Sequence, residues 1–129
     1  MESGLIAMKA PRLLHRPSAE NLISEGCYIS ELSNSDADPD LSIAQARVPP
    51  AVSTAWHSLS ATNERYLILE GEGVVEVDGL QPAAVHRGDV ILIPAGCRQR
   101  ITNTSDTADL LFLALCTPPF RQENYCEAK

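Results

Sequence analysis

The chain has 129 residues, of which 44% are hydrophobic and 21% charged, a composition typical of one globular domain that buries its own core. Its formal net charge of −7 argues against nucleic acid and anionic membrane surfaces as partners, because both attract basic proteins. The apolar runs are too short to cross a bilayer and the N-terminus lacks a signal-peptide pattern, so we expect a cytoplasmic protein.

Residues 1–40 differ in composition from the rest of the chain. Basic residues come first, and a later stretch holds six acidic residues with no basic residue among them. Ser18 is a favourable helix N-cap, so a short helical turn is expected over residues 18–22. We expect residues 1–40 to form an N-terminal arm that packs on the main domain or on a partner subunit.

From residue 41 onward, short apolar segments alternate with turn residues about every ten positions, which is typical of a β-sandwich or barrel. Eight strands are expected, at residues 41–48, 54–60, 64–70, 74–77, 83–86, 90–93, 98–103 and 110–116. The pattern predicts an all-β, single-domain jelly roll over residues 41–117, with residues 71–73 as a turn. Residues 118–129 are expected to be a short C-terminal tail.

Two groups of residues in this region have a distinctive spacing. The first group is His57, Glu64 and Gly71, and the second is Gly88, Pro94, Gly96, Gln99 and Asn103. The chain thereby resembles the cupin family, whose motifs are G-x5-H-x-H-x3,4-E-x6-G and G-x5-P-x-G-x2-H-x3-N. Three positions depart from these motifs, with Ala51 in place of the opening glycine, Leu59 in place of the second histidine and Gln99 in place of the third.

The resemblance implies a jelly-roll barrel in which His57, Glu64 and Gln99 meet inside the mouth. Strand side chains alternate in direction, so residues two apart along a strand share a face. The residues expected to line the ligand-binding cavity beside Gln99 are Leu59, Tyr66, Ile68, Ile101 and Phe112.

A complete cupin site offers three imidazoles and one carboxylate to a divalent metal ion, and this chain keeps one imidazole. His57, Glu64 and Gln99 are the candidate metal ligands, with Cys97 as a soft substitute, for an ion that is weakly bound or absent. An amide oxygen is a poor ligand for such metals. The alternative is a buried His57 that pairs with Glu64 and binds no metal.

Three functions remain open at this point. In the first, a small-molecule metabolite undergoes isomerase- or lyase-like chemistry, with Glu64 and His57 as acid and base and Gln99 orienting it. In the second, the barrel binds or senses a sugar-like small molecule without metal or catalysis. In the third, His57, Glu64 and water hold a metal weakly.

The resemblance also implies a homodimer. The apolar residues of the arm need an apolar surface, which a partner subunit would supply. These residues are Leu5, Ile6, Leu13, Leu14, Leu22 and Ile23.

Overall fold

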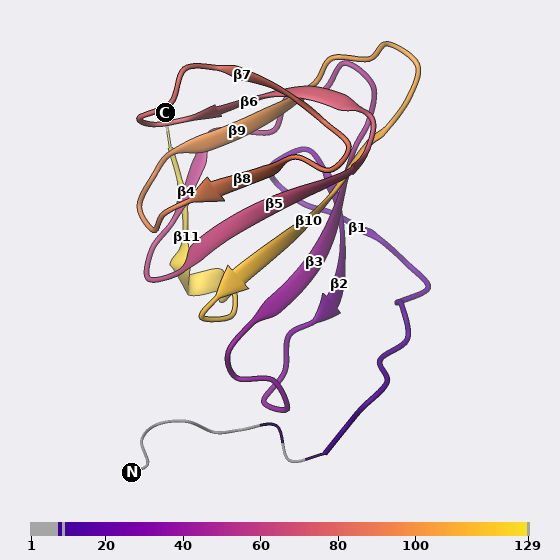
Figure 1. Ribbon diagram of the computed structural model, residues 1–129, viewed down its shortest axis with the longest axis vertical. Helices are drawn as coiled ribbons and strands as arrows, with labels where there is room; N and C mark the ends of the chain where they lie inside the picture. The colour runs from indigo at the N-terminus through magenta and orange to yellow at the C-terminus, as the bar shows by residue number, and fades with distance from the viewer. Residues whose placement is uncertain (1–7, 9, 129) are drawn as a thin grey trace.

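The computed structural model describes residue 8 and residues 10–128. In this part of the chain, antiparallel strands form two sheets that face each other (Figure 1). The all-β jelly roll predicted from the spacing of short strands is therefore confirmed. None of the helical segments among the described residues is long and apolar enough to span a membrane.

The first sheet has six strands in the order β1-β2-β3-β10-β5-β8. Their bounds are β1 Asn21–Leu22, β2 Tyr28–Ser33, β3 Ser42–Val48, β10 Leu110–Thr117, β5 Asn63–Glu70 and β8 Val90–Ile93. The three longest strands, β3, β10 and β5, lie side by side at its centre.

The second sheet has five strands in the order β11-β4-β9-β6-β7. Their bounds are β11 Tyr125–Glu127, β4 His57–Leu59, β9 Gln99–Asn103, β6 Glu72–Val77 and β7 Ala83–His86. A single 3-10 turn, η1 Gln122–Asn124, precedes β11. Because β11 pairs with β4, the C-terminal segment is held beside the strand that carries His57.

The core lies between the sheets and follows the alternation expected of strands. In β5 every second residue from Glu64 to Ile68 is buried, and in β9 the same holds from Gln99 to Asn103. Alternate side chains of a strand point to opposite faces, so these buried residues all face the space between the sheets. The two strands therefore bury the polar residues Glu64, Gln99 and Asn103 among mainly apolar neighbours.

Two expectations about local structure are wrong. Residues 18–22 do not form a helical turn, because residues 21–22 pair with β2 as strand β1, and sheet pairing overrides a weak local helical preference. The expected turn at residues 71–73 is shorter, since β6 begins at Glu72. Gly71, with a φ of +90°, turns the chain from β5 in one sheet to β6 in the other.

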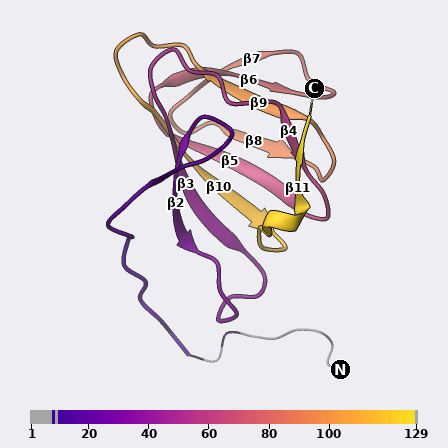
Figure 2. The same cartoon turned by 180° about the vertical axis from the view of Figure 1, so that it is seen from behind.

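The segment expected to be an arm has two parts in the structure. Residues 10–20 have no regular structure and extend away from the edge of the first sheet where β1 and β2 lie (Figures 1 and 2), and Leu13 there is 78% exposed. Strands β1 and β2 extend the first sheet. Leu5 and Ile6 lie outside the described residues. The division into an arm, a barrel and a tail stays a prediction.

Candidate functional site

The three motif residues come from three strands and lie in the interior. His57 is on β4, Glu64 on β5 and Gln99 on β9, and they are 2%, 7% and 1% exposed, respectively. His57 and Gln99 are direct partners in the register between β4 and β9, while Glu64 comes from the other sheet. The fold thus places all three between the sheets, although they are far apart in the sequence.

Gln99 is tied to the facing sheet through its amide oxygen. The hydroxyl of Tyr66 donates a hydrogen bond to Gln99 Oε1 at 2.5 Å, and the Tyr66 ring packs on Phe112 with 4.3 Å between ring centroids. Within residues 10–128, Gln99 Nε2 has no hydrogen-bond partner. Gln99 therefore keeps an unused donor in the interior, while its one strong acceptor is occupied.

Glu25 is a fourth polar residue of this interior, and the sequence analysis did not single it out. It lies in the tight turn between β1 and β2, which the backbone hydrogen bonds from Gly26 to Ile23 and from Ile23 to Cys27 hold together. Its side chain is 15% exposed, and Glu25 Oε1 lies 3.5 Å from His57 Nε2. The turn thus inserts a carboxyl group opposite the one motif histidine.

The orientation of His57 follows from its backbone contact. Its Nδ1 lies 3.0 Å from the carbonyl oxygen of Ala55, and a carbonyl only accepts hydrogen bonds, so Nδ1 carries the proton. The other ring nitrogen, Nε2, then faces Glu25. The Tyr125 ring stacks on the imidazole at 5.3 Å between centroids and fixes the plane of the ring.

Burial shifts the acid–base equilibria of these groups toward their neutral forms. Desolvation, with a smaller contribution from the negative charge of Glu64, raises the pKa of Glu25 to about 8. Desolvation also raises the pKa of Glu64 to about 7, although the Gln99 amide and the Cys116 thiol oppose the shift. The pKa of His57 is lowered, mainly by burial. At neutral pH, Glu25 and His57 therefore form an uncharged acid beside an uncharged imidazole.

The carboxyl oxygens of Glu64 have weaker polar contacts than that of Glu25 with His57. Glu64 Oε2 accepts only a weak contact from Cys116 Sγ at 3.9 Å. Among the described residues, no donor forms a hydrogen bond of normal geometry with the buried Glu64 Oε1. The Gln99 amide, whose Nε2 also lacks a partner of normal geometry, acts on this carboxyl only weakly, by lowering its pKa. A buried carboxyl oxygen without a partner carries a free-energy cost, and such groups call for an explanation.

Two adjoining cavities reach these residues. The inner cavity, of about 50 Å³, is walled largely by buried side chains, and the outer cavity, of about 160 Å³, includes exposed residues at its rim. The residues that line both are Glu25, Ile29, Glu64, Ala114 and Phe120.

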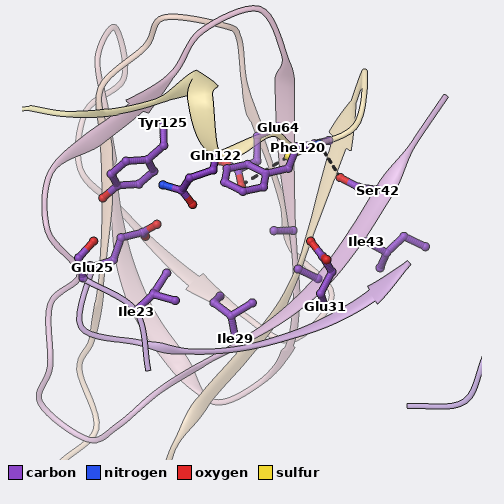
Figure 3. A pocket seen from close by; sticks show the side chains of 14 residues that line it. Ile23, Glu25, Ile29, Glu31, Ser42, Ile43, Glu64, Phe120, Gln122 and Tyr125 are labelled. Atoms are coloured by element: carbon purple, nitrogen blue, oxygen red, sulfur yellow. Dashed lines mark hydrogen bonds between the residues drawn. The ribbon is translucent and has the colours of Figure 1, made fainter. Parts of the chain in front are cut away.

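Figure 3 shows the outer cavity between two segments from opposite ends of the chain. Phe120, Gln122 and Tyr125 of the C-terminal segment form one wall, and the stretch around β2, including Glu25 and Glu31, forms the other. Both ends of the chain, which carry neither motif, thus complete the site.

The expected wall residues divide into two groups. Leu59, Tyr66 and Phe112 line the inner cavity beside His57. Ile68 and Ile101 do not line either cavity; they are 1% and 0% exposed and pack in the core. These two lie two residues beyond Tyr66 and Gln99 on their strands and belong to the hydrophobic core.

Two candidate metal ligands also lie away from the cavity walls. Gln99 bonds to the wall residue Tyr66 without lining a cavity itself, and Cys97 packs, partly buried, against the apolar core.

The donor set does not fit the divalent metal of a complete cupin site. Of the described residues, no three His, Cys, Asp or Glu side chains are grouped to hold a metal ion. His57 Nδ1 is engaged by a backbone carbonyl, Gln99 Oε1 accepts from Tyr66, and Leu59 has no donor atom. Three protein ligands are the usual minimum for a catalytic zinc site.

The comparisons with known proteins agree with the motif resemblance. A family model described as a cupin domain matches residues 44–116. An uncharacterized protein of Methanocaldococcus jannaschii is 29% identical over 122 residues, which are 93% of this chain and 96% of that protein. An oxalate-binding protein of Thermotoga maritima is 38% identical over 72 residues, which are 56% of this chain and 58% of that protein.

A solved structure shows the same architecture. It is described as a predicted oxalate decarboxylase from Thermotoga maritima, with a TM-score of 0.72 and 27% identity. The match covers 83% of this chain and 99% of that one.

Proposed function

The chain belongs to the cupin family, and we propose that it binds a small molecule between its sheets and moves a proton on that molecule. The chemistry would be of the isomerase or lyase type, which needs an acid and a base but no redox centre. The observation that carries this proposal is that Glu25 and Glu64 line both cavities and have pKa values of about 8 and 7.

These two pKa values support different roles for the two carboxyl groups. A general base works best when its pKa lies near the working pH, and the pKa of about 7 suits Glu64 to accept a proton. Glu25, with its pKa of about 8, holds a proton at neutral pH and can donate it. Pairs of titratable groups with different environments commonly divide the acid and base roles in this way.

His57 acts on Glu25 as a positioning and proton-accepting partner. Because Nδ1 is held by the Ala55 carbonyl, Nε2 is available to accept the Glu25 proton or to return it. His57 and Glu64 thus keep the acid–base roles expected from the sequence, and Glu25 joins them as a third acid–base group. Gln99 supports the site indirectly, by fixing the Tyr66 hydroxyl on the cavity wall.

Neither oxalate nor a metal ion forms part of this proposal. Two of the similar proteins are named for oxalate, which carries two negative charges. Among the described residues that line the two cavities there is no Lys or Arg to neutralise such an anion. The donor set does not fit a metal that could take that role.

A binding or sensing barrel without catalysis is the second candidate. It is favoured by Leu59 and Gln99, which stand at two metal-ligand positions of the family: Leu59 has no donor atom, and Gln99 Oε1 already accepts from Tyr66. A sugar-like neutral molecule is the ligand that this alternative predicts.

Proton exchange separates the two candidates. A panel of small carbonyl, hydroxyl and amine metabolites is incubated with the protein in D₂O, and incorporation of deuterium at carbon is followed by proton NMR. We expect exchange with at least one compound, and we expect Glu64→Gln to slow it by about 10²–10⁴-fold, the usual contribution of a general base. Glu70→Gln, at the exposed end of the same strand, is the matched control and should leave the rate unchanged.

Two results would count against the enzyme. Binding without any exchange across the panel favours the sensing barrel, because it shows a ligand site with no proton transfer. An exchange rate that survives Glu64→Gln removes Glu64 from the role of base. The homodimer and the cytoplasmic location expected from the sequence stay predictions.

A further inference from the structure

The walls of the two cavities carry a strong bias in charge. Three glutamates line them, Glu25 and Glu64 in both cavities and Glu31 at the exposed rim of the outer one. Among the described lining residues, none is a Lys or Arg, and the one histidine, His57, is neutral at ordinary pH because its pKa is lowered. An anion entering this space would meet only negative or uncharged groups, whereas a cation would be attracted.

The unpartnered oxygen of Glu64 indicates what the ligand must supply. Glu64 Oε1 is buried without a donor from any described residue, and the side chain lines both cavities. Glu64 lies on β5, which pairs with β10 on one side and with β8 on the other. A ligand with an N–H group at this point would satisfy the orphan oxygen, and a charged N–H donor forms the stronger hydrogen bond.

The remaining walls fit the other parts of a small amine. The apolar side chains of Ile29, Ala114 and Phe120 line both cavities and suit a short hydrocarbon chain. The aromatic ring of Tyr125 also lines the outer cavity, and aromatic faces attract cations (Figure 3). The volumes of about 50 and 160 Å³ are below the roughly 300–1,000 Å³ of pockets for drug-sized ligands. The ligand therefore has few heavy atoms.

Building on the proposed binding role of this interior, we propose that the ligand is a small organic cation with N–H groups, a primary or secondary alkylammonium. Its ammonium group enters the inner cavity and donates to Glu64 Oε1, with Glu25 beside it. Its hydrocarbon part lies in the outer cavity against Ile29, Ala114 and Phe120.

Three probes of nearly equal size and different charge test this assignment. Butylammonium, butan-1-ol and butyrate are titrated into the full-length protein by isothermal calorimetry at pH 8.5. An alkylammonium keeps its charge there, because such amines titrate near 10.4, as lysine does. We expect butylammonium to bind at least about tenfold more tightly than butan-1-ol, and butyrate to bind more weakly than either.

Glutamate variants locate the interaction. Glu64→Gln should weaken the binding of butylammonium by about tenfold or more. The affinity for butan-1-ol should stay within about twofold, because the substitution removes the charge and keeps the shape of the side chain. Glu25→Gln is the second variant, and it should weaken the binding of butylammonium but not that of butan-1-ol. Glu70→Gln, on the exposed end of β5, should change neither affinity.

Each contrary outcome has a separate meaning. Equal binding of butylammonium and butan-1-ol overturns the cation assignment and leaves the proposed binding role intact. Tighter binding of butyrate than of butylammonium overturns it as well. Failure of all three probes, together with no hit in the metabolite panel, overturns both this inference and the proposed function.

Discussion

Glu25 and Glu64 keep their protons at pH values at which ordinary glutamates have lost them. Their ordinary pKa is 4.5, and burial raises the values to about 8 and about 7. Between the ordinary pKa of 4.5 and the raised values of about 7 and 8, the folded protein still holds protons that the unfolded chain has released. Stability therefore falls as the pH rises from 4.5 toward 8. His57 opposes this trend only below pH 6.5, because its lowered pKa leaves it neutral while the unfolded imidazole is charged.

This linkage predicts the effect of Glu25→Gln on stability. The amide keeps the shape of the side chain without a charge, so the variant should gain stability relative to the wild type at high pH. We expect a gain on the order of 4 kcal/mol at pH 8.5 and one of about 1 kcal/mol or less at pH 5. Guanidinium chloride unfolding at the two pH values measures it. A stability difference that is independent of pH would contradict the raised pKa of Glu25.

The sequence predicts part of this cluster and misses the rest for a physical reason. His57, Glu64 and Gln99 were found because the motif spacing and the alternation of strand residues place them in the interior together. Glu25 was not, because it lies in a turn outside both motifs, one of six acidic residues in its region. Only the pairing of β1 with β2 carries its side chain to His57. The one local signal is Gly26, because glycine is favoured in tight turns.

At the scale of the elements, Gly71 is where the chain leaves one sheet for the other. A Cβ atom at this position would lie 2.6 Å from the carbonyl oxygen of Asp109, at a φ of +90°. Gly88 has the same φ of +90°, but a Cβ there would meet nothing within 4 Å. The two glycines of the motif therefore differ in crowding while sharing a backbone conformation.

This difference predicts the cost of alanine at each position. Gly88→Ala should destabilise the fold by about 1–2 kcal/mol, the strain of a left-handed residue with a Cβ. Gly71→Ala should cost more than about 3 kcal/mol, because the clash with backbone adds to the same strain. Urea unfolding of both variants measures the two values. Equal costs would show that crowding at Gly71 contributes nothing.

Most strands could be predicted from turn residues and apolar spacing, but the point at which β6 begins could not. The sequence indicates a turn over residues 71–73, whereas Glu72 and Gly73 already pair with β7 and β9. Glycine usually weakens a strand, so its presence argued for a turn. Gly73 is needed inside the strand because a Cβ there would lie 2.6 Å from the Thr102 carbonyl oxygen. This close approach of two strands is a tertiary fact that local composition does not contain.

At the scale of the whole molecule, the jelly roll brings the cupin positions together, but Leu59 and Gln99 at two of them offer no donor atom and a poor amide ligand, respectively. We predict that untagged protein carries less than about 0.1 equivalent of divalent metal by elemental analysis. The double variant Leu59→His, Gln99→His should gain zinc affinity by roughly 100-fold or more, since two imidazoles return to β4 and β9. The single variant Leu59→His, which restores one imidazole, is the intermediate control. A stoichiometric metal in the wild type would contradict the donor-set argument.

The two ends of the chain complete the molecule around this interior. β2 with its preceding turn and the segment from Phe120 to Tyr125 form opposite walls of the outer cavity (Figure 3). The motifs cover only the middle of the chain, so the sequence predicted the centre of the site and the inner wall formed by Leu59, Tyr66 and Phe112, but not the walls of the outer cavity. Two of the three glutamates that line the cavities, Glu25 and Glu31, belong to these walls, which the sequence did not predict.

Burial of Glu25 and Glu64 in the folded barrel makes these two carboxyls ionise near neutral pH. Carbon-13 NMR of the protein labelled at the glutamate carboxyl carbons measures this directly, with Glu25→Gln and Glu64→Gln used to assign the two signals. We expect these two carboxyls to titrate with apparent midpoints near 8 and 7, as a coupled pair, while the exposed Glu70 serves as the internal reference. Midpoints near 4.5 for both Glu25 and Glu64 would show that burial does not raise their pKa values.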